Sequence, residues 1–202
     1  MKSAEKNPGE ATEKQLAATF THYRCRRLSQ ADTVKAAVLC PLFTRKDQVH
    51  LLFIKRSQSV KKHKGEISFP GGVQEKSDSS LLATCLRETE EEVGIGAGDI
   101  RIIGRLDDVY TTTGYVVSPF LGLIPYPYPF RLCSREVDFL LPVPLATLAD
   151  EVNQYEFFYF NGRKLYDLVA YRIGGEIIWG ATAKIVARLL QLLQNNNLLP
   201  PS

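Results

Sequence analysis

The stretch from Gly71 to Ile95 constrains the fold of this chain more than any other. It reads GGVQEKSDSSLLATCLRETEEEVGI, a glycine turn followed by a polar loop and then by a segment with helical hydrophobic periodicity. The residues at this period, which predict the inward face, are Leu82, Leu86, Thr89 and Val93. Asp78 or Ser79 is placed to cap the start of the helix, and Gly94 is placed to end it. The pattern therefore predicts a helix that packs one face against a sheet.

The same predicted helix crowds carboxylates onto a second face. Glu88, Glu91 and Glu92 stand at positions i, i+3 and i+4 and share that face, whereas Glu90 points elsewhere. Like charges at these spacings destabilise an isolated helix by roughly 0.2–0.5 kcal/mol per pair. The simplest compensation is a divalent cation that prefers oxygen ligands, Mg²⁺ or Mn²⁺. On charge alone, a solvated acidic surface helix is the alternative interpretation.

The complete pattern resembles the Nudix box, whose family form is G-x5-E-x7-R-E-U-x-E-E-x-G-U, with U an aliphatic residue. The matching positions are Gly72, Arg87, Glu88, Glu91, Glu92, Gly94 and Ile95. The chain departs from the pattern in three places. Asp78 replaces the first glutamate, eight residues rather than seven separate it from Arg87, and Thr89 stands where an aliphatic residue is usual.

The first two departures match one Nudix subgroup, the coenzyme A pyrophosphatases. That subgroup also carries an upstream signature resembling L-L-x-x-R-S-x(n)-H-x-G-x-[IV]-x-F-P-G-G. The residues that fit it are Leu51, Leu52, Arg56, Ser57, His63, Gly65, Ile67, Phe69, Pro70, Gly71 and Gly72. Lys61-Lys62 and Glu66 are looser matches. The two patterns run together over about 45 residues, and weaker similarity extends to Ile178-Trp179-Gly180 and Thr182-Ala183.

The resemblance implies a role for each matching residue. Glu88, Glu91 and Glu92 are the expected ligands of Mg²⁺ or Mn²⁺, and Arg87 is expected to hold these glutamates in place. The expected substrate-binding residues are Arg56, Ser57, Lys62, His63, Phe69, Gly71 and Gly72. The general base is expected to be Glu91 or Glu136, and the pattern does not separate the two. Glu151 and Glu156 compete with Glu136 for that role.

The implied activity is hydrolysis of the pyrophosphate bond of coenzyme A or acyl-CoA, giving 3′,5′-ADP and 4′-phosphopantetheine or its acyl form. Two alternatives stay open. A Nudix pyrophosphatase could instead act on ADP-ribose, NADH or a damaged nucleotide. A Nudix domain could also bind a nucleotide as a sensor without hydrolysis, but such a domain is expected to lose carboxylates of the box.

Composition bounds the class of protein. The 202 residues suit one domain, with residues 1–30 as an N-terminal extension and helix and residues 31–202 as the Nudix domain. A net charge of +3 is too small to argue for nucleic acid, and no apolar run reaches the ~18 residues that cross a membrane. The absence of a signal-peptide pattern and four scattered cysteines, expected to be free thiols, point to the cytoplasm. A nucleotide-like small molecule is the expected partner, and a homodimer is left open.

The rest of the chain predicts strands and helices in alternation, a mixed sheet between helices. The predicted strands are residues 34–39, 49–54, 100–106, 115–124 and 139–145, with a hairpin of residues 155–160 and 163–172 around Asn161-Gly162. The predicted flanking helices are residues 12–28 and 177–193, the latter with Ile178, Ile185, Leu189 and Leu193 inward and Trp179 in the core. Similarity to the Nudix family implies an α/β fold, an α/β/α sandwich with a mixed sheet as its middle layer.

Three polar groups outside the box have two interpretations each. The basic group Arg24, Arg26 and Arg27 is either a solvated helix end or a contact for an anion. The loop 55–64, rich in lysine and arginine, is either a solvated loop or a positive patch that steers a polyphosphate. Asp107 and Asp108 either join the acidic site or lie in a hairpin loop.

Overall fold

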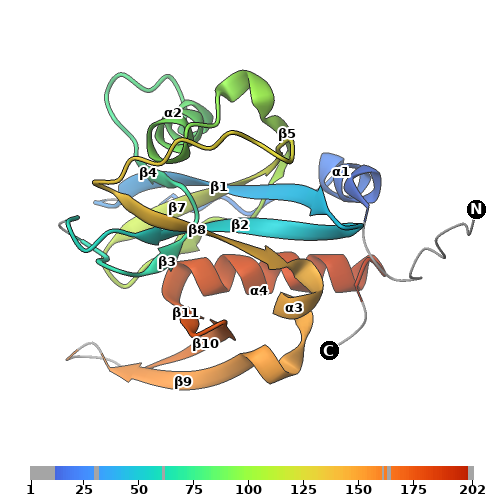
Figure 1. Cartoon of the computed structure of the whole chain (residues 1–202). Helices are drawn as coiled ribbons and strands as arrows, with labels where there is room; N and C mark the ends of the chain where they lie inside the picture. The colour runs from blue at the N-terminus through green and yellow to red at the C-terminus, as the bar shows by residue number, and fades with distance from the viewer. Residues whose placement is uncertain (1–11, 30–31, 61, 161, 163–164, 200–202) are drawn as a thin grey trace, which may run out of the picture.

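One mixed sheet forms the middle layer of the protein in the computed structural model, which describes residues 12–29, 32–60, 62–160, 162 and 165–199 (Figure 1). Within these residues the main order is β3-β2-β1-β7-β5, with β4 beside β1, β6 beside β7 and β8 beside β2. The strands are β1 (Val34–Arg45), β2 (Gln48–Arg56), β3 (Ile67–Ser68), β4 (Gly71–Val73), β5 (Arg101–Arg105), β6 (Val109–Tyr110), β7 (Tyr115–Leu123) and β8 (Val137–Pro144). β1 and β7 run parallel, and the other pairs are antiparallel.

Helices cover both faces of this sheet (Figure 1). α2 (Leu81–Val93) lies on one face, and α4 (Gly180–Asn195) lies on the other beside the short α3 (Leu145–Ala149). α1 (Glu13–Thr21) packs near β5. A smaller sheet of β9 (Gln154–Phe160), β10 (Leu165–Ile173) and β11 (Glu176–Ile178) lies on the α4 side. Two short 3₁₀ helices are also present, η1 (Ala97–Asp99) and η2 (Glu151–Asn153). The predicted α/β/α sandwich with a mixed sheet is confirmed.

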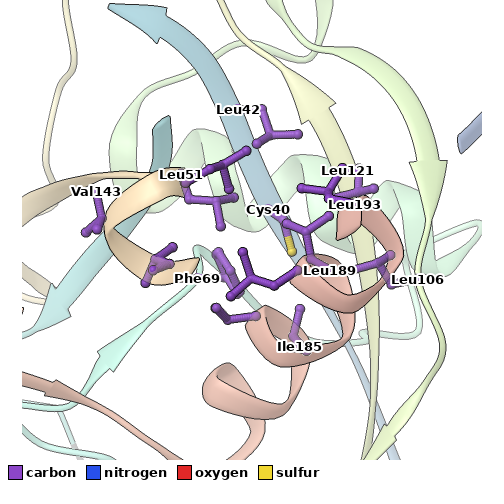
Figure 2. Close-up of a cluster of buried hydrophobic side chains, with 14 of the residues drawn as sticks. Cys40, Leu42, Leu51, Phe69, Leu106, Leu121, Val143, Ile185, Leu189 and Leu193 are labelled. Atoms are coloured by element: carbon purple, nitrogen blue, oxygen red, sulfur yellow. The ribbon is translucent and has the colours of Figure 1, made fainter. Parts of the chain in front are cut away.

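The core has two parts because the central strands are covered on both sides. Along β1, Cys40 and Leu42 face α4, whereas Leu39 and Phe43 face α2. Figure 2 shows the first part, in which Leu189 and its neighbours on α4 meet the sheet. This two-sided burial explains why the strand reads as a continuous apolar run instead of an alternating one.

The predicted hairpin between the first two strands is confirmed. Arg45 pairs with Gln48, and the two turn residues between them, Lys46 and Asp47, have φ angles of 51° and 61°. Positive φ at both central positions is the geometry of a tight hairpin turn.

The prediction for the start of the acidic helix was wrong in detail. Ser80, not Asp78 or Ser79, caps α2 by accepting a hydrogen bond from the Ala83 N–H at 3.1 Å. At the other end the prediction is confirmed, since Gly94 takes the left-handed conformation with φ 74°. The fully buried positions of α2 are Thr84, Cys85, Thr89, Glu92 and Val93. Thr89 and Val93 of the predicted inward face are thus buried, whereas Leu82 and Leu86 are half-buried and pack against the edge of the core.

The two flanking helices are shorter than predicted. α1 ends at Thr21, so the basic group 24–27 follows the helix and does not form its last turn. α4 begins at Gly180, because Glu176–Ile178 pairs with β10 as β11. Trp179 precedes the helix and is half-buried, not a core residue as predicted.

The second predicted hairpin is confirmed as the pairing of β9 with β10, while residues 161, 163 and 164 of its turn lie outside the described residues. The expected frayed start, residues 1–10, and the last residues 200–202 lie outside them as well. All four cysteines are free, with Cys40 and Cys85 buried and the other two half-buried. Among the described helices, none is long and apolar enough to span a membrane.

Candidate active site

Glu92 is the most buried carboxylate beside the glycine turn. β4 pairs with β1 so that Gly71 lies against the last turns of α2 and donates its N–H to Glu92 Oε2 at 2.9 Å. Arg56, from the end of β2, donates to Glu92 Oε1 at 3.2 Å. The side chain is 2% exposed, and burial raises the pKa of Glu92 to about 7. The Gly71 N–H and Arg56 oppose this rise, and nearby negative charges add to it.

Glu88 lies one helical turn before Glu92, and its carboxylate also faces the glycine turn, next to Gly72. Burial raises the pKa of Glu88, Arg87 opposes the rise, and the charges of Glu91 and Glu136 add to it. Glu136 has the same effect on the pKa of Glu92. Glu136 follows a loop and precedes β8, so its carboxylate approaches the α2 carboxylates from a separate segment of the chain. The structure therefore gathers negative charge from two elements at one end of α2.

Arg87 is anchored on one side and faces the glutamates on the other. Its Nε and Nη2 donate to the two oxygens of Asp78 at 3.0 Å each. Asp78 also accepts from the Glu75 N–H at 2.8 Å and from the Thr84 hydroxyl at 2.9 Å. The Arg87 guanidinium, helped by these donors, holds the pKa of Asp78 well below its usual range. Asp78, at the position of the first glutamate of the box, thus fixes Arg87 instead of capping the helix.

The free side of the guanidinium contacts two carboxylates of the acidic face. Arg87 Nη1 lies 3.0 Å from Glu88 Oε1 and 3.3 Å from Glu91 Oε2. Glu91 is the most exposed of the three glutamates, at 60%. In the part of the chain that the structure describes, no three acidic, histidine or cysteine side chains already converge as a metal cluster. The carboxylates instead turn to Arg87, to Arg56 and to the Gly71 N–H.

The basic loop before the glycine turn contributes exposed cationic groups. Lys62 donates to the Tyr115 hydroxyl at 2.8 Å and lies 5.4 Å from the centre of that ring. His63 has a φ of 56°, and its Nδ1 lies 3.0 Å from Glu66 Oε2. This hydrogen bond with Glu66 raises the pKa of His63. Both side chains are exposed to solvent.

Two of the predicted substrate-binding residues face inward. Ser57 is buried, its hydroxyl accepts from the Ser59 N–H at 3.1 Å, and its own N–H donates to the Glu136 carbonyl at 2.8 Å. Phe69 is 2% exposed and lies in the core (Figure 2). Its ring stacks on that of Phe53, with the ring centres 4.7 Å apart. Because the side chain is buried, it is part of the core under the glycine turn, and only the backbone of Phe69 is placed to contact a ligand.

Other carboxylates considered from the sequence lie elsewhere. Asp107 binds Tyr23 and Arg188 on the α4 side of the sheet, and Asp108 binds Arg105. Their hairpin loop therefore does not join the acidic face of α2. The exposed Glu151 and Glu156 belong to η2 and β9. The sequence interpretation missed Tyr23 and Arg188 as the partners of Asp107, because they come from segments about 80 residues away.

Replacing Gly72 by alanine should damage the site without unfolding the protein. A Cβ at this position would lie 2.4 Å from the Glu88 carboxylate and meet no backbone atom among its three nearest neighbours. Glu88 would have to move, and a displacement of about 1 Å near a reacting centre costs up to ~10²-fold in rate. We expect kcat to fall at least tenfold with an unchanged melting temperature. Wild-type activity in Gly72→Ala would show that the position of Glu88 is unimportant.

Comparison with known proteins agrees with this geometry. The NUDIX domain model matches residues 33–161, from β1 through β9. An uncharacterized Nudix hydrolase NudL from Yersinia enterocolitica is 35% identical over 161 residues, 80% of this chain and 82% of that protein. The NudL protein of Yersinia pestis is 34% identical over 174 residues, 86% of this chain and 84% of its own.

A solved structure supports the fold. The MutT/nudix family protein from Enterococcus faecalis superposes with a TM-score of 0.56 at 14% identity, covering 92% of this chain and 70% of that one. Since the family model spans more than half of the chain and the relatives match it over most of their length, the chain belongs to the Nudix hydrolase family.

Proposed function

We propose that the protein hydrolyses the pyrophosphate bond of coenzyme A or acyl-CoA, with Mg²⁺ or Mn²⁺, to 3′,5′-ADP and 4′-phosphopantetheine or its acyl form. The observation that carries the proposal is the acidic face of α2 beside the glycine turn, where burial raises the pKa of both Glu88 and Glu92 and the charge of Glu136 adds to the rise. Carboxylates gathered in this way favour a bound cation, and oxygen donors suit Mg²⁺ or Mn²⁺.

Glu88, Glu91 and Glu92 are the residues that would hold the metal. When bound, the ion supplies positive charge to the phosphate oxygens and lowers the pKa of a coordinated water. Arg87 keeps Glu88 and Glu91 together, and the Gly71 N–H and Arg56 orient Glu92. Arg56 and Arg87 are thus positioning residues. For Arg56 this replaces the role predicted from the sequence, which was direct contact with the substrate.

The proton of the attacking water goes to a carboxylate, Glu91 or Glu136. Glu91 is exposed, and its Oε2 lies 3.3 Å from Arg87 Nη1. Glu136 is also exposed, and its backbone carbonyl is fixed by the Ser57 N–H at the end of β2. Comparing kcat of Glu91→Gln and Glu136→Gln across pH separates them, since loss of the base removes the acidic limb of the profile.

Support for a coenzyme A substrate comes from the basic loop and its signature residues. Coenzyme A carries a 3′-phosphate in addition to its pyrophosphate, and the exposed Lys62 and His63 offer cationic groups for it. ADP-ribose and NADH lack that phosphate, so the loop would have less to bind. The chemistry at the acidic face would be the same for all of these substrates.

Turnover of a substrate panel tests the proposal. Coenzyme A, dephospho-coenzyme A, ADP-ribose and NADH are incubated with protein and Mg²⁺, and mass spectrometry identifies the bond that is cut. We expect coenzyme A to give the highest kcat/KM. Lys62→Gln should raise KM for coenzyme A but not for the dephospho form, while Lys64→Gln, an exposed lysine of the same loop, serves as the charge-matched control. Preference for ADP-ribose, or ligand binding without turnover, would contradict the substrate assignment.

The pKa of Glu92 predicts how stability of the metal-free protein depends on pH. The pKa is about 7 in the folded protein against 4.5 for an ordinary glutamate, so the folded state binds more protons and stability falls as pH rises. The stabilising contribution of Glu92 is fully present below pH 4.5, and it is lost as the pH rises from 4.5 through about 7. Between about pH 5.5 and 8.5 this amounts to roughly 2 kcal/mol.

Urea unfolding in EDTA measures this effect as a difference between wild type and Glu92→Gln, because the glutamine does not titrate. The stability of the variant relative to wild type should increase as the pH rises. A difference that does not change with pH would show that Glu92 titrates at its ordinary pKa.

A further inference from the structure

A second concave site lies on the side of the sheet opposite to α2. It is a cavity of about 740 Å³ between the segment 23–28 that follows α1, the residues 107–110 around β6, and α4. α2 covers the other face of the sheet (Figure 1). The volume falls within the range of small-molecule pockets, ~300–1,000 Å³. The chemistry proposed above for α2 makes no use of this cavity.

The two carboxylates in the wall of the cavity already have donors. Asp107 accepts from the Tyr23 hydroxyl and the Arg26 N–H at 2.7 Å each, and from Arg188 Nε at 3.1 Å. Asp108 forms an ion pair with Arg105 and accepts from the Ser118 hydroxyl at 2.8 Å and from the Leu28 N–H at 2.9 Å. These bonds tie the segment after α1 to β6 and α4, so the carboxylates build the wall and their charge is neutralised.

Positive charge remains in the same wall. Arg24, Arg26 and Lys184 line the cavity, and within the described residues none of their side chains forms an ion pair. Arg24 and Arg26 come from the segment after α1, whereas Lys184 comes from α4, so the three cations border one space from two sides. Guanidinium groups match the geometry of phosphate oxygens, and lysine adds a compact charge.

Two tyrosine rings complete the lining. Tyr110 is 43% exposed, and Tyr23 lies below the Arg188 guanidinium at 5.9 Å. Burial and the hydrogen bond to Asp107 raise the pKa of Tyr23. Aromatic faces beside cations are suited to a ligand that joins a planar ring to an anionic group.

We propose that this cavity is a second ligand site that takes a small phosphorylated molecule with an aromatic ring, a nucleotide-like anion, independently of the metal-binding face. Arg24, Arg26 and Lys184 bind the phosphate, and the tyrosines contact the ring. Arg24 and Arg26 of the basic group that follows α1 are then ligand contacts and not a solvated helix end. The site does not depend on the substrate proposed above.

Calorimetric titration of the full chain with ADP in EDTA tests the site, because chelation removes metal-dependent binding at α2. We expect one saturable site that survives in Glu92→Gln and weakens at least tenfold in Arg24→Ser/Arg26→Ser and in Lys184→Gln. Arg101→Ser, an exposed arginine of β5 outside the cavity, removes a like charge and should leave the affinity unchanged. Hydrolysis of coenzyme A in the absence of ADP should be unchanged in all the cavity variants.

Inorganic pyrophosphate serves as the second probe, and we expect it to bind the same site at least threefold more weakly because it has no ring. Three outcomes would overturn the proposal. These are the absence of ADP binding to wild type at millimolar concentration, binding that is lost in Glu92→Gln but kept in the cavity variants, and equal weakening by Arg101→Ser.

Discussion

Replacing Glu92 by glutamine should lower turnover on the order of 10³-fold while the protein stays folded. Glutamine has the same shape and can still accept the Gly71 N–H, so the glycine turn keeps its contact. It lacks the negative charge that a divalent cation requires and that Arg56 neutralises. The loss therefore falls on the chemical step and not on the fold. Steady-state kcat with saturating Mg²⁺ and far-UV circular dichroism measure the two properties separately.

Glu90 provides the matched control for this variant. It lies on the same helix two positions away, is exposed, and points away from the other glutamates. Glu90→Gln removes an identical charge and should change kcat less than twofold. If Glu92→Gln retained activity within tenfold of wild type, Glu92 would not be a metal ligand, and the assignment of the acidic face would fail with it.

Replacing Gly71 by alanine should cost about 4 kcal/mol of stability, a large part of the total for a domain of this size. Gly71 has a φ of 147°, a conformation that residues with a Cβ rarely adopt. A Cβ would lie 2.3 Å from the carbonyl oxygen of Ala37 and 2.6 Å from the Cα of Val38. Both atoms belong to the backbone of β1, the central strand, which cannot move aside without losing its pairing with β7.

Gly98→Ala is the control for the loss of a glycine. Gly98 lies in η1, has no positive φ, and a Cβ there would meet nothing within 4 Å. The free energy of unfolding of the Gly98→Ala variant, measured in urea, should stay within about 0.5 kcal/mol of wild type. A Gly71→Ala variant destabilised by less than about 1 kcal/mol would show that the turn adapts by a small shift. Gly71→Ala and Gly72→Ala therefore distinguish the roles of the two adjacent glycines. Gly71 leaves room for the backbone of β1, whereas Gly72 leaves room for the Glu88 carboxylate.

Local sequence was sufficient for the elements whose pattern depends on near neighbours. The apolar run of β1, the turn of Lys46 and Asp47, and the end of α2 at Gly94 were all predictable, since periodicity and positive φ are properties of short segments. Where neighbouring elements compete, prediction was less accurate. β11 takes Glu176–Ile178 from the start of the predicted last helix, because pairing with β10 outweighs helical periodicity there.

The sequence by itself determined that Glu88, Glu91 and Glu92 share one helical face, because helical geometry alone sets that spacing. Only the tertiary structure decided that Glu92 is buried against Gly71 with a pKa of about 7, because burial depends on β4 closing over α2. Likewise, only the fold brought Asp107 to Tyr23 and Arg188, since no local pattern encodes contacts between segments about 80 residues apart. Spacing along the chain thus specified the chemical groups, while long-range packing set their charge and their surroundings.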